Sequence, residues 1–80
     1  MDIGDYTIRP SKHFAMGWMR KWGYGIKSIR DAIDNAIKIE KVGKTKYEAY
    51  IRTKGGGRKI IFIKDDITME ILVITGAEGK

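Results

Sequence analysis

The sequence predicts an α+β domain in which two helices pack on one face of an antiparallel sheet, in the order β-α-α-β-β-β. Three observations predict this class. Apolar residues recur at helical spacing in the first half of the chain. After Gly43 they alternate with polar residues, as in a strand covered on one side. Two turn signals, Gly55-Gly56 and Asp65-Asp66, then divide the remaining residues into three strands.

Length and composition limit the classes of function. Eighty residues form a single core, so we expect one domain over residues 1–80, with 76–80 as a polar tail. The absence of cysteine excludes disulfides and thiolate zinc sites, and a single histidine excludes the HExxH metal motif. We therefore expect no metal and no cofactor. Fourteen isoleucines against one leucine and one asparagine resemble the composition of heat-adapted proteins.

The first strand and the first helix are predicted from local signals. Tyr6 to Arg9 reads as a short strand, which Pro10 ends because it has no N–H for the ladder. Ser11 stands where a helix N-cap belongs. The apolar face of the helix follows at 100° per residue and comprises Phe14, Ala15, Trp18, Met19 and Trp22. Gly23-Tyr24-Gly25 then provides the glycines that a left-handed C-cap needs.

A second helix is predicted from about Ile26 to Lys41. Its apolar residues share one face at i, i+3, i+4 and i+7 spacing and comprise Ile26, Ile29, Ile33, Ala36 and Ile37. Asp31 and Asp34 lie on the outer face among lysines, where we interpret them as partners in surface ion pairs rather than as catalytic acids.

Turn chemistry predicts the strand registers. A two-residue loop at Gly55-Gly56 sets Ile51 opposite Ile60 and Arg52 opposite Lys59. A second loop at Asp65-Asp66 sets Phe62 opposite Met69 and Ile61 opposite Glu70, with the last strand running from about Ile67 to Thr75. Both loops give the same alternation. The helices are expected on the face with the buried apolar side chains, which leaves the other face open.

The open face is predicted to carry the candidate site. Residues 41–64 contain eight basic residues and one acidic residue, which suits a polyanionic partner. Arg52 faces Lys59 across the strands, an unfavourable pairing that an anion or a diagonal acid, Glu70, would relieve. Tyr50 lies two residues from Arg52, as a base-stacking side chain would. The other candidate contacts to nucleic acid are Lys46, Lys54 and Arg58.

Each feature also has a purely structural interpretation. The glycine run is also explained as a permissive turn, and the basic residues as a rim that keeps the protein in solution. His13 and Arg20 share a helical stripe and are candidates for proton transfer and phosphate binding, or simply exposed polar residues. An apolar strip on the open face is typical of a surface for a protein partner or a second copy. It comprises Ile61, Ile63 and Leu72.

Four short matches resemble a known family. His13-Phe14, Gly25-Ile26, Tyr47-Glu48-Ala49 and Val73-Ile74-Thr75, in this order of elements, resemble a small domain family grouped beside BrnT in the RelE/ParE/BrnT toxin superfamily. The resemblance covers nearly the whole chain. It implies an RNA-cleaving toxin that works without a metal, because the RNA 2′-hydroxyl attacks its own phosphate, and that a small antitoxin neutralises.

We therefore expect a toxin-like RNA-binding protein that acts as a metal-independent ribonuclease, with ribosome-associated mRNA as one candidate substrate. The candidate catalytic residues are Arg52, Lys59, His13, Arg20 and Glu70. Arg52 and Lys59 would stabilise the charge on phosphate, while Glu70 or His13 would accept a proton. The alternatives are a non-catalytic nucleic-acid-binding module and a protein-interaction domain. With neither a secretory signal nor a long apolar run, we expect a cytoplasmic protein without a membrane partner.

Overall fold

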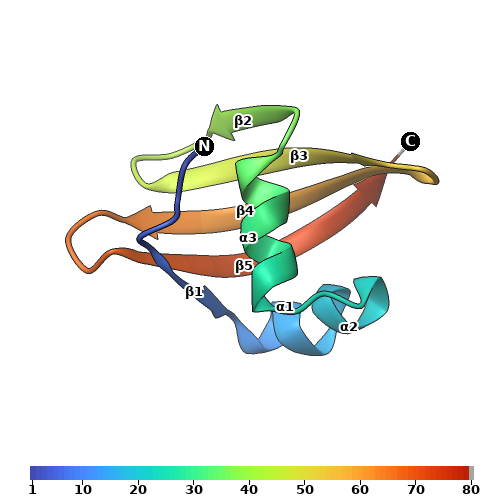
Figure 1. Cartoon of the computed structure of the whole chain (residues 1–80), viewed down its shortest axis with the longest axis horizontal. Coiled ribbons are helices and arrows are strands. Elements are labelled where there is room, and N and C mark those ends of the chain that lie inside the picture. Colours follow the sequence, from blue (N-terminus) through green and yellow to red (C-terminus); the bar gives the residue numbers. More distant parts are fainter. Residues whose placement is uncertain (80) are drawn as a thin grey trace.

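The chain forms an α+β domain, as predicted, but with a larger and mixed sheet. The computed structural model describes residues 1–79. Its elements are β1 (Thr7–Pro10), α1 (Lys12–Met16), α2 (Trp18–Trp22), α3 (Ile26–Asp34), β2 (Lys38–Lys41), β3 (Lys46–Thr53), β4 (Gly56–Asp65) and β5 (Glu70–Gly79). The strand order is β1-β5-β4-β3-β2, with β1 parallel to β5 and the other neighbours antiparallel. The prediction of a purely antiparallel, four-stranded sheet was wrong. Figure 1 shows α3 across the sheet, with α1 and α2 beside β5.

The first predicted helix is divided into α1 and α2 at Gly17, whose φ of −104° and ψ of −94° are not helical. Its two ends agree with the sequence. The Ser11 hydroxyl accepts a hydrogen bond from the Phe14 N–H at 3.1 Å, and Gly23 ends α2 in the left-handed conformation with φ 69°. The Trp22 end of the segment contacts the sheet, because the Trp22 indole donates to the Glu78 carboxylate on β5 at 2.9 Å. The Trp22 ring then packs on Phe14, with ring centroids 5.9 Å apart.

The second predicted helix ends seven residues early, at Asp34, and residues 38–41 form β2 instead. Asn35 closes α3, because its side-chain amide donates to the Asp31 carbonyl at 2.9 Å. The Ile37 N–H already donates to the Tyr50 carbonyl at 2.9 Å, which starts the pairing of β2 with β3. Pairing satisfies the backbone groups that the outer edge of β3 would otherwise leave open, and this outweighs the helical pattern.

The β3–β4 hairpin is shifted by two residues from the predicted register. Lys54-Gly55 forms the turn, and Ala49 rather than Ile51 lies opposite Ile60. Gly56, the first residue of β4, has φ 138°, a conformation that favours glycine. A shift by an even number of residues keeps every side chain on its predicted face.

The β4–β5 connection is longer than predicted. Four residues, 66–69, separate Asp65 from its partner Glu70, so Phe62 lies opposite Val73 and not Met69. The Asp65 carboxylate accepts hydrogen bonds from the N–H groups of Ile67 at 2.9 Å and Thr68 at 3.1 Å, which stabilises this turn.

An irregularity in the ladder then changes the alternation of β5. On the side of the β4–β5 turn, Phe62 pairs with Val73. The next pair towards the end of β5 is Ile61 with Thr75, which leaves Ile74 as an extra residue. The strand continues to Gly79, so residues 76–79 are part of the sheet rather than a polar tail, and Lys80 lies outside the described residues. Gly76 is buried below the aromatic side chains of α1 and α2, and a Cβ there would lie 2.8 Å from the Trp22 ring.

The core lies between the helices and one face of the sheet. Its buried members come from the N-terminal segment, from α1 and α3, and from four strands: Ile3, Ile8, Phe14, Ile29, Ile33, Ala49, Ile60, Phe62, Ile71 and Val73. Trp18 and Trp22 pack against this cluster as half-buried residues. The opposite face of β2, β3 and β4 is therefore open to solvent, and the candidate site lies there.

Candidate nucleic-acid interface

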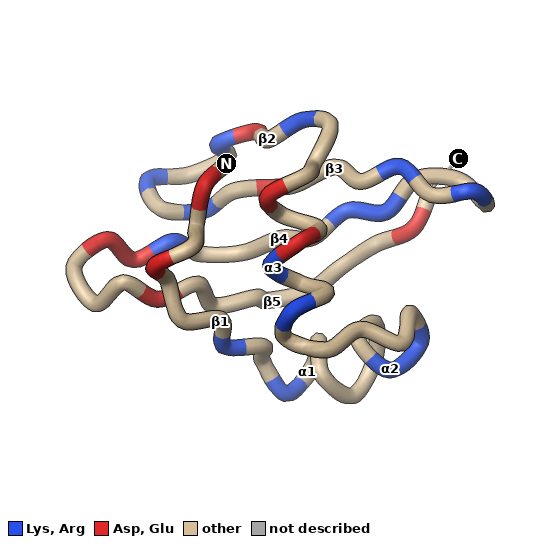
Figure 2. The backbone as a smooth tube through the Cα atoms, viewed as in Figure 1, with Lys and Arg blue, Asp and Glu red and all other residues tan. Residues whose placement is uncertain are grey.

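The open face brings together three of the predicted residues. Tyr50 lies directly opposite Lys59, and Arg52 follows Tyr50 on the same face of β3, opposite Gly57. The like-charge pairing of Arg52 with Lys59 that the sequence predicted is therefore wrong, because the two-residue shift moves them to neighbouring rows. Their common face, on which the predicted site depends, is confirmed. Figure 2 shows that Lys and Arg residues gather near the turn between β3 and β4.

Tyr50 is the centre of this arrangement. Its ring lies between two ammonium groups, with Lys38 Nζ at 5.5 Å and Lys59 Nζ at 5.8 Å from the ring centroid. The register places Lys38, Tyr50 and Lys59 in one row across β2, β3 and β4. We call these three residues and Arg52 the cationic cluster. Lys38 was missed by the sequence analysis because it was assigned to a helix, although the alternation of apolar and polar residues over 37–40 was a signal for a strand.

A carboxylate lies beside the cluster. Glu48 accepts a hydrogen bond from the Tyr50 hydroxyl at 2.8 Å and lies 3.6 Å from Lys59 Nζ, with both side chains of that ion pair more than half covered. The hydrogen bond to Glu48 is the main reason that the pKa of Tyr50 is raised, with desolvation second. Tyr50 therefore stays a neutral phenol and a hydrogen-bond donor at neutral pH. Glu48 was not among the predicted site residues, although its place on the open face was evident from the alternation.

The cations of this face differ in how they are paired. Lys38 forms an ion pair with Glu40 at 3.1 Å and Lys59 with Glu48 at 3.6 Å. Within residues 1–79, neither Arg52 nor Lys54 forms a salt bridge or a side-chain hydrogen bond, and both are exposed. Among the described residues, these two cations near the turn, and Lys46 at the far end of β3, are therefore free to bind an anion.

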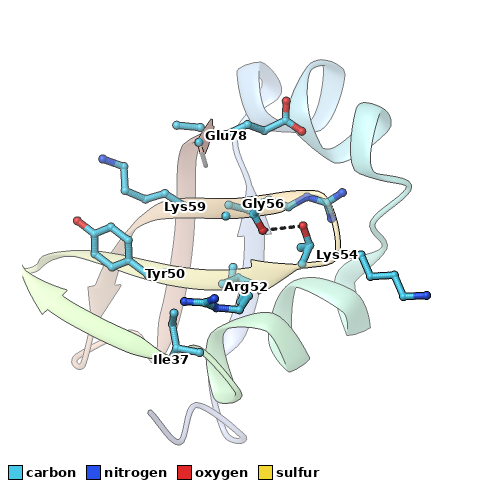
Figure 3. A pocket seen from close by; sticks show the side chains of 13 residues that line it. Ile37, Tyr50, Arg52, Lys54, Gly56, Lys59 and Glu78 are labelled. Carbon is cyan, nitrogen blue, oxygen red and sulfur yellow. Dashed lines mark hydrogen bonds between the residues drawn. The ribbon is translucent and has the colours of Figure 1, made fainter.

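A hollow of about 590 Å³ lies at the hairpin end of the sheet. We call it the hairpin hollow, and the residues that matter for its chemistry are Tyr50, Arg52, Lys54, Gly57, Lys59 and Gly79. Figure 3 shows Tyr50 and Lys59 extending on one side, Lys54 on the other and Arg52 between them. An aromatic ring and cationic groups therefore border the same concave surface.

Arg58 lies on the other face of the sheet. Its guanidinium carbon is 5.0 Å from the Trp22 ring centroid and 5.6 Å from that of Tyr24, within the range of cation–π contacts. Its cross-strand partner Glu78 accepts hydrogen bonds from Lys21 Nζ at 2.7 Å and Trp22 Nε1 at 2.9 Å. Neighbouring residues in a strand point to opposite faces, so Arg58 lies on the helical side while Lys59 lies on the open face. Its contacts with Trp22 and Tyr24 connect α2 and the segment after it to the sheet.

The remaining candidates lie apart from the cationic cluster. The Glu70 carboxylate forms an ion pair with Arg9 at 2.9 Å, and its strand partner is Asp65, six residues along β4 from Lys59. The His13 ring Nε2 is 3.1 Å from the Thr75 hydroxyl on β5, and Arg20 is exposed on α2. Lys46 is exposed on β3, opposite Ile63. The structure thus pairs Lys59 with Glu48 and not with Glu70.

The apolar strip is partly covered. Ile61 and Ile63 are half-buried in the middle of the open face, and Leu72 on β5 is exposed.

Searches of protein-family models, of curated proteins and of solved structures found no match to this chain. None of the helices formed by residues 1–79 has the length and apolar character needed to cross a bilayer.

Proposed function

We propose that this protein binds single-stranded RNA on its open face. The observation that carries the proposal is the Tyr50 ring, which lies in a row between Lys38 and Lys59 with the unpaired Arg52 beside it. Proteins that bind single strands combine aromatic side chains, on which bases stack, with cations that follow the phosphates. The cationic cluster has both elements on one exposed surface.

Binding would rearrange the lysines rather than the backbone. The Lys38 and Lys59 ammonium groups lie over the Tyr50 ring on flexible stems, so a base can take the place of one of them. The displaced ammonium is then free to contact a phosphate. Arg52 needs no such exchange, because its guanidinium has no protein partner within residues 1–79. Duplexes are poorer ligands in this scheme, since their bases are already stacked.

The test is a titration of a fluorescein-labelled 12-nucleotide RNA by fluorescence anisotropy. If Lys38, Arg52 and Lys59 each neutralise one phosphate, the slope of log K against log salt is about −2, so affinity falls by roughly 20-fold between 50 and 200 mM salt. Tyr50→Leu removes the stacking platform and should weaken binding by about 5- to 150-fold, the equivalent of about 1–3 kcal/mol. Lys12→Met is the control for the loss of one charge, because Lys12 is an exposed cation on α1 that is not a candidate for the site.

Two results would contradict the proposal. One is an absence of binding at 50 mM salt. The other is an equal loss in Arg52→Met and Lys12→Met with no loss in Tyr50→Leu, which would mean that net charge alone governs association.

Ribonuclease activity of the toxin type is a second candidate function, which the contact of Glu48 with Tyr50 and Lys59 favours. In the scheme that the RelE/ParE/BrnT resemblance implies, the 2′-oxygen bonds to the adjacent phosphorus, and the bond from phosphorus to the 5′-oxygen breaks. Glu48 would accept the 2′-hydroxyl proton, and the 5′-oxygen would leave with the bonding electrons and take a proton from water. Lys59 and Arg52 would stabilise the charge on the phosphate. An antitoxin partner and ribosome-associated mRNA belong to the same proposal.

Incubation of cellular RNA with the purified protein in EDTA tests this activity. We expect cleavage products that disappear in Glu48→Gln, while the affinity of that variant for a non-cleavable 2′-deoxy oligonucleotide is kept. Intact RNA at high protein concentration would leave the binding function without the cleavage function.

A further inference from the structure

The three consecutive glycines of the hairpin have different structural reasons. Gly55 lies in the turn, and Gly56 has φ 138°, which a residue with a side chain rarely adopts. Gly57 lies inside β4 rather than in the turn, its φ is not positive, and a Cβ added there would have only ordinary contacts, the nearest being 3.7 Å from the Gly79 carbonyl oxygen. Neither the backbone conformation nor the packing of the fold requires glycine at position 57.

Glycine inside a strand lowers stability, and it often marks a place where a ligand approaches the backbone. Gly57 pairs with Gly79 on β5 and with Arg52 on β3. A Cβ at Gly79 would meet nothing within 4 Å. The next row contains Ala77 beside Lys59. At the hairpin end of β4 and β5, two glycines and an alanine therefore leave the open face bare apart from Lys59, whereas the rows beyond carry longer side chains.

This bare surface is part of the hairpin hollow. Its volume of about 590 Å³ lies within the range of small-molecule sites, about 300–1,000 Å³. Arg52, Lys54 and Lys59 contribute positive charge. The acidic residue among its lining residues, Glu78, already accepts hydrogen bonds from Lys21 and Trp22 on the other side of the sheet. The hollow thus favours an anion, and the Tyr50 ring at its border favours an anion that carries a flat ring.

We propose that the hairpin hollow takes a single nucleotide, with its phosphate on Arg52 and Lys54 and its base over Gly57 beside Tyr50. The proposal rests on the proposed function, because the same face would bind the RNA chain. A free nucleotide and one nucleotide unit of a strand share the chemistry that the hollow recognises. The bare floor is the element that a merely basic surface would not need.

The test is calorimetric titration of the full chain with AMP, with adenosine and with the 12-nucleotide RNA. Adenosine lacks the phosphate and should bind at least tenfold more weakly than AMP. Gly57→Thr places a branched side chain on the floor and should weaken AMP binding at least tenfold, with a melting temperature equal to or above that of the parent protein. Gly55→Ala is the matched control, because Gly55 lies outside the hollow and a Cβ there meets nothing within 4 Å.

The outcomes separate the two proposals. RNA binding without AMP binding, or with Gly57→Thr unchanged in affinity, overturns the nucleotide site and leaves the RNA-binding function in place. AMP binding with RNA bound no more tightly than AMP supports the nucleotide site and contradicts the RNA-binding function. If Gly57→Thr lowers the melting temperature, the comparison of AMP with adenosine in the parent protein decides, and equal affinities refute the site.

Discussion

Replacement of Gly76 by alanine tests how α1 and α2 pack on the sheet. A Cβ at this position would lie 2.8 Å from Trp22 Cη2, 3.2 Å from Phe14 Cε1 and 3.2 Å from the Lys59 carbonyl oxygen. Real Cβ contacts of 2.8 Å essentially do not occur, so an aromatic side chain or the strand has to move. Overpacking of this kind costs about 1–3 kcal/mol. For a domain of this size the melting temperature should fall by roughly 4 to 24 °C.

The measurement is thermal unfolding followed by circular dichroism and by tryptophan fluorescence, which reports on Trp18 and Trp22. Gly57→Ala is the matched control, since its Cβ would have no contact closer than 3.7 Å. We expect it to be neutral or to stabilise the protein, because alanine restricts the unfolded chain more than glycine does. If Gly76→Ala melts at the same temperature as the parent protein, the aromatic side chains do not cover β5 in the way described above.

Three further predictions concern stability. Hydrogen bonds from the Lys21 ammonium, and secondly from the Trp22 indole, hold the pKa of Glu78 in the folded protein below its ordinary value of 4.5. The contribution of ionised Glu78 to the free energy of unfolding is therefore present above pH 4.5 and is lost as the pH falls through the lowered pKa of the folded state. The melting temperature of Glu78→Gln should therefore fall less than that of the parent protein between about pH 5 and pH 3. An equal fall in both proteins would contradict this role of Glu78. Arg30 donates to the backbone carbonyls of residues 3, 4 and 6, and Arg30→Met should cost about 1.5–3 kcal/mol in urea unfolding. Asp65→Ala should speed amide hydrogen exchange at residues 67 and 68, because their N–H groups donate hydrogen bonds to the Asp65 carboxylate. Unchanged protection at these two residues would contradict the role of Asp65 in the β4–β5 turn.

Local features of the fold were predictable where one residue decides them. Ser11 caps α1 and Gly23 ends α2, because a hydroxyl acceptor and a residue free to adopt positive φ satisfy the ends of helices wherever they lie. The common face of Tyr50, Arg52 and Lys59 was also predictable, since the period of a strand fixes the alternation and the observed register differs from the predicted one by an even number of residues.

Features that depend on distant partners were not predictable. The apolar spacing of the second predicted helix led to the expectation that the helix continues through residues 38–41. These residues instead pair with the edge of β3 and form a strand. The partners of Lys59 and Glu70 depend on registers that the turn residues alone do not fix, so Glu48 replaced Glu70 beside the site. Arg58 was expected to contribute to the site, but it lies against the Trp22 and Tyr24 rings of the helical side.

The sequence by itself determined which side chains share a face of a strand and where the helical segment between Ser11 and Gly23 begins and ends, because these depend on backbone periodicity and on single residues at the caps. The tertiary structure decided the parallel pairing of β1, the strand β2, the extra residue in β5 and the bare floor formed by Gly57 and Gly79. Each of these results from hydrogen bonds or contacts between residues far apart in the chain, whose free energy local propensity does not contain.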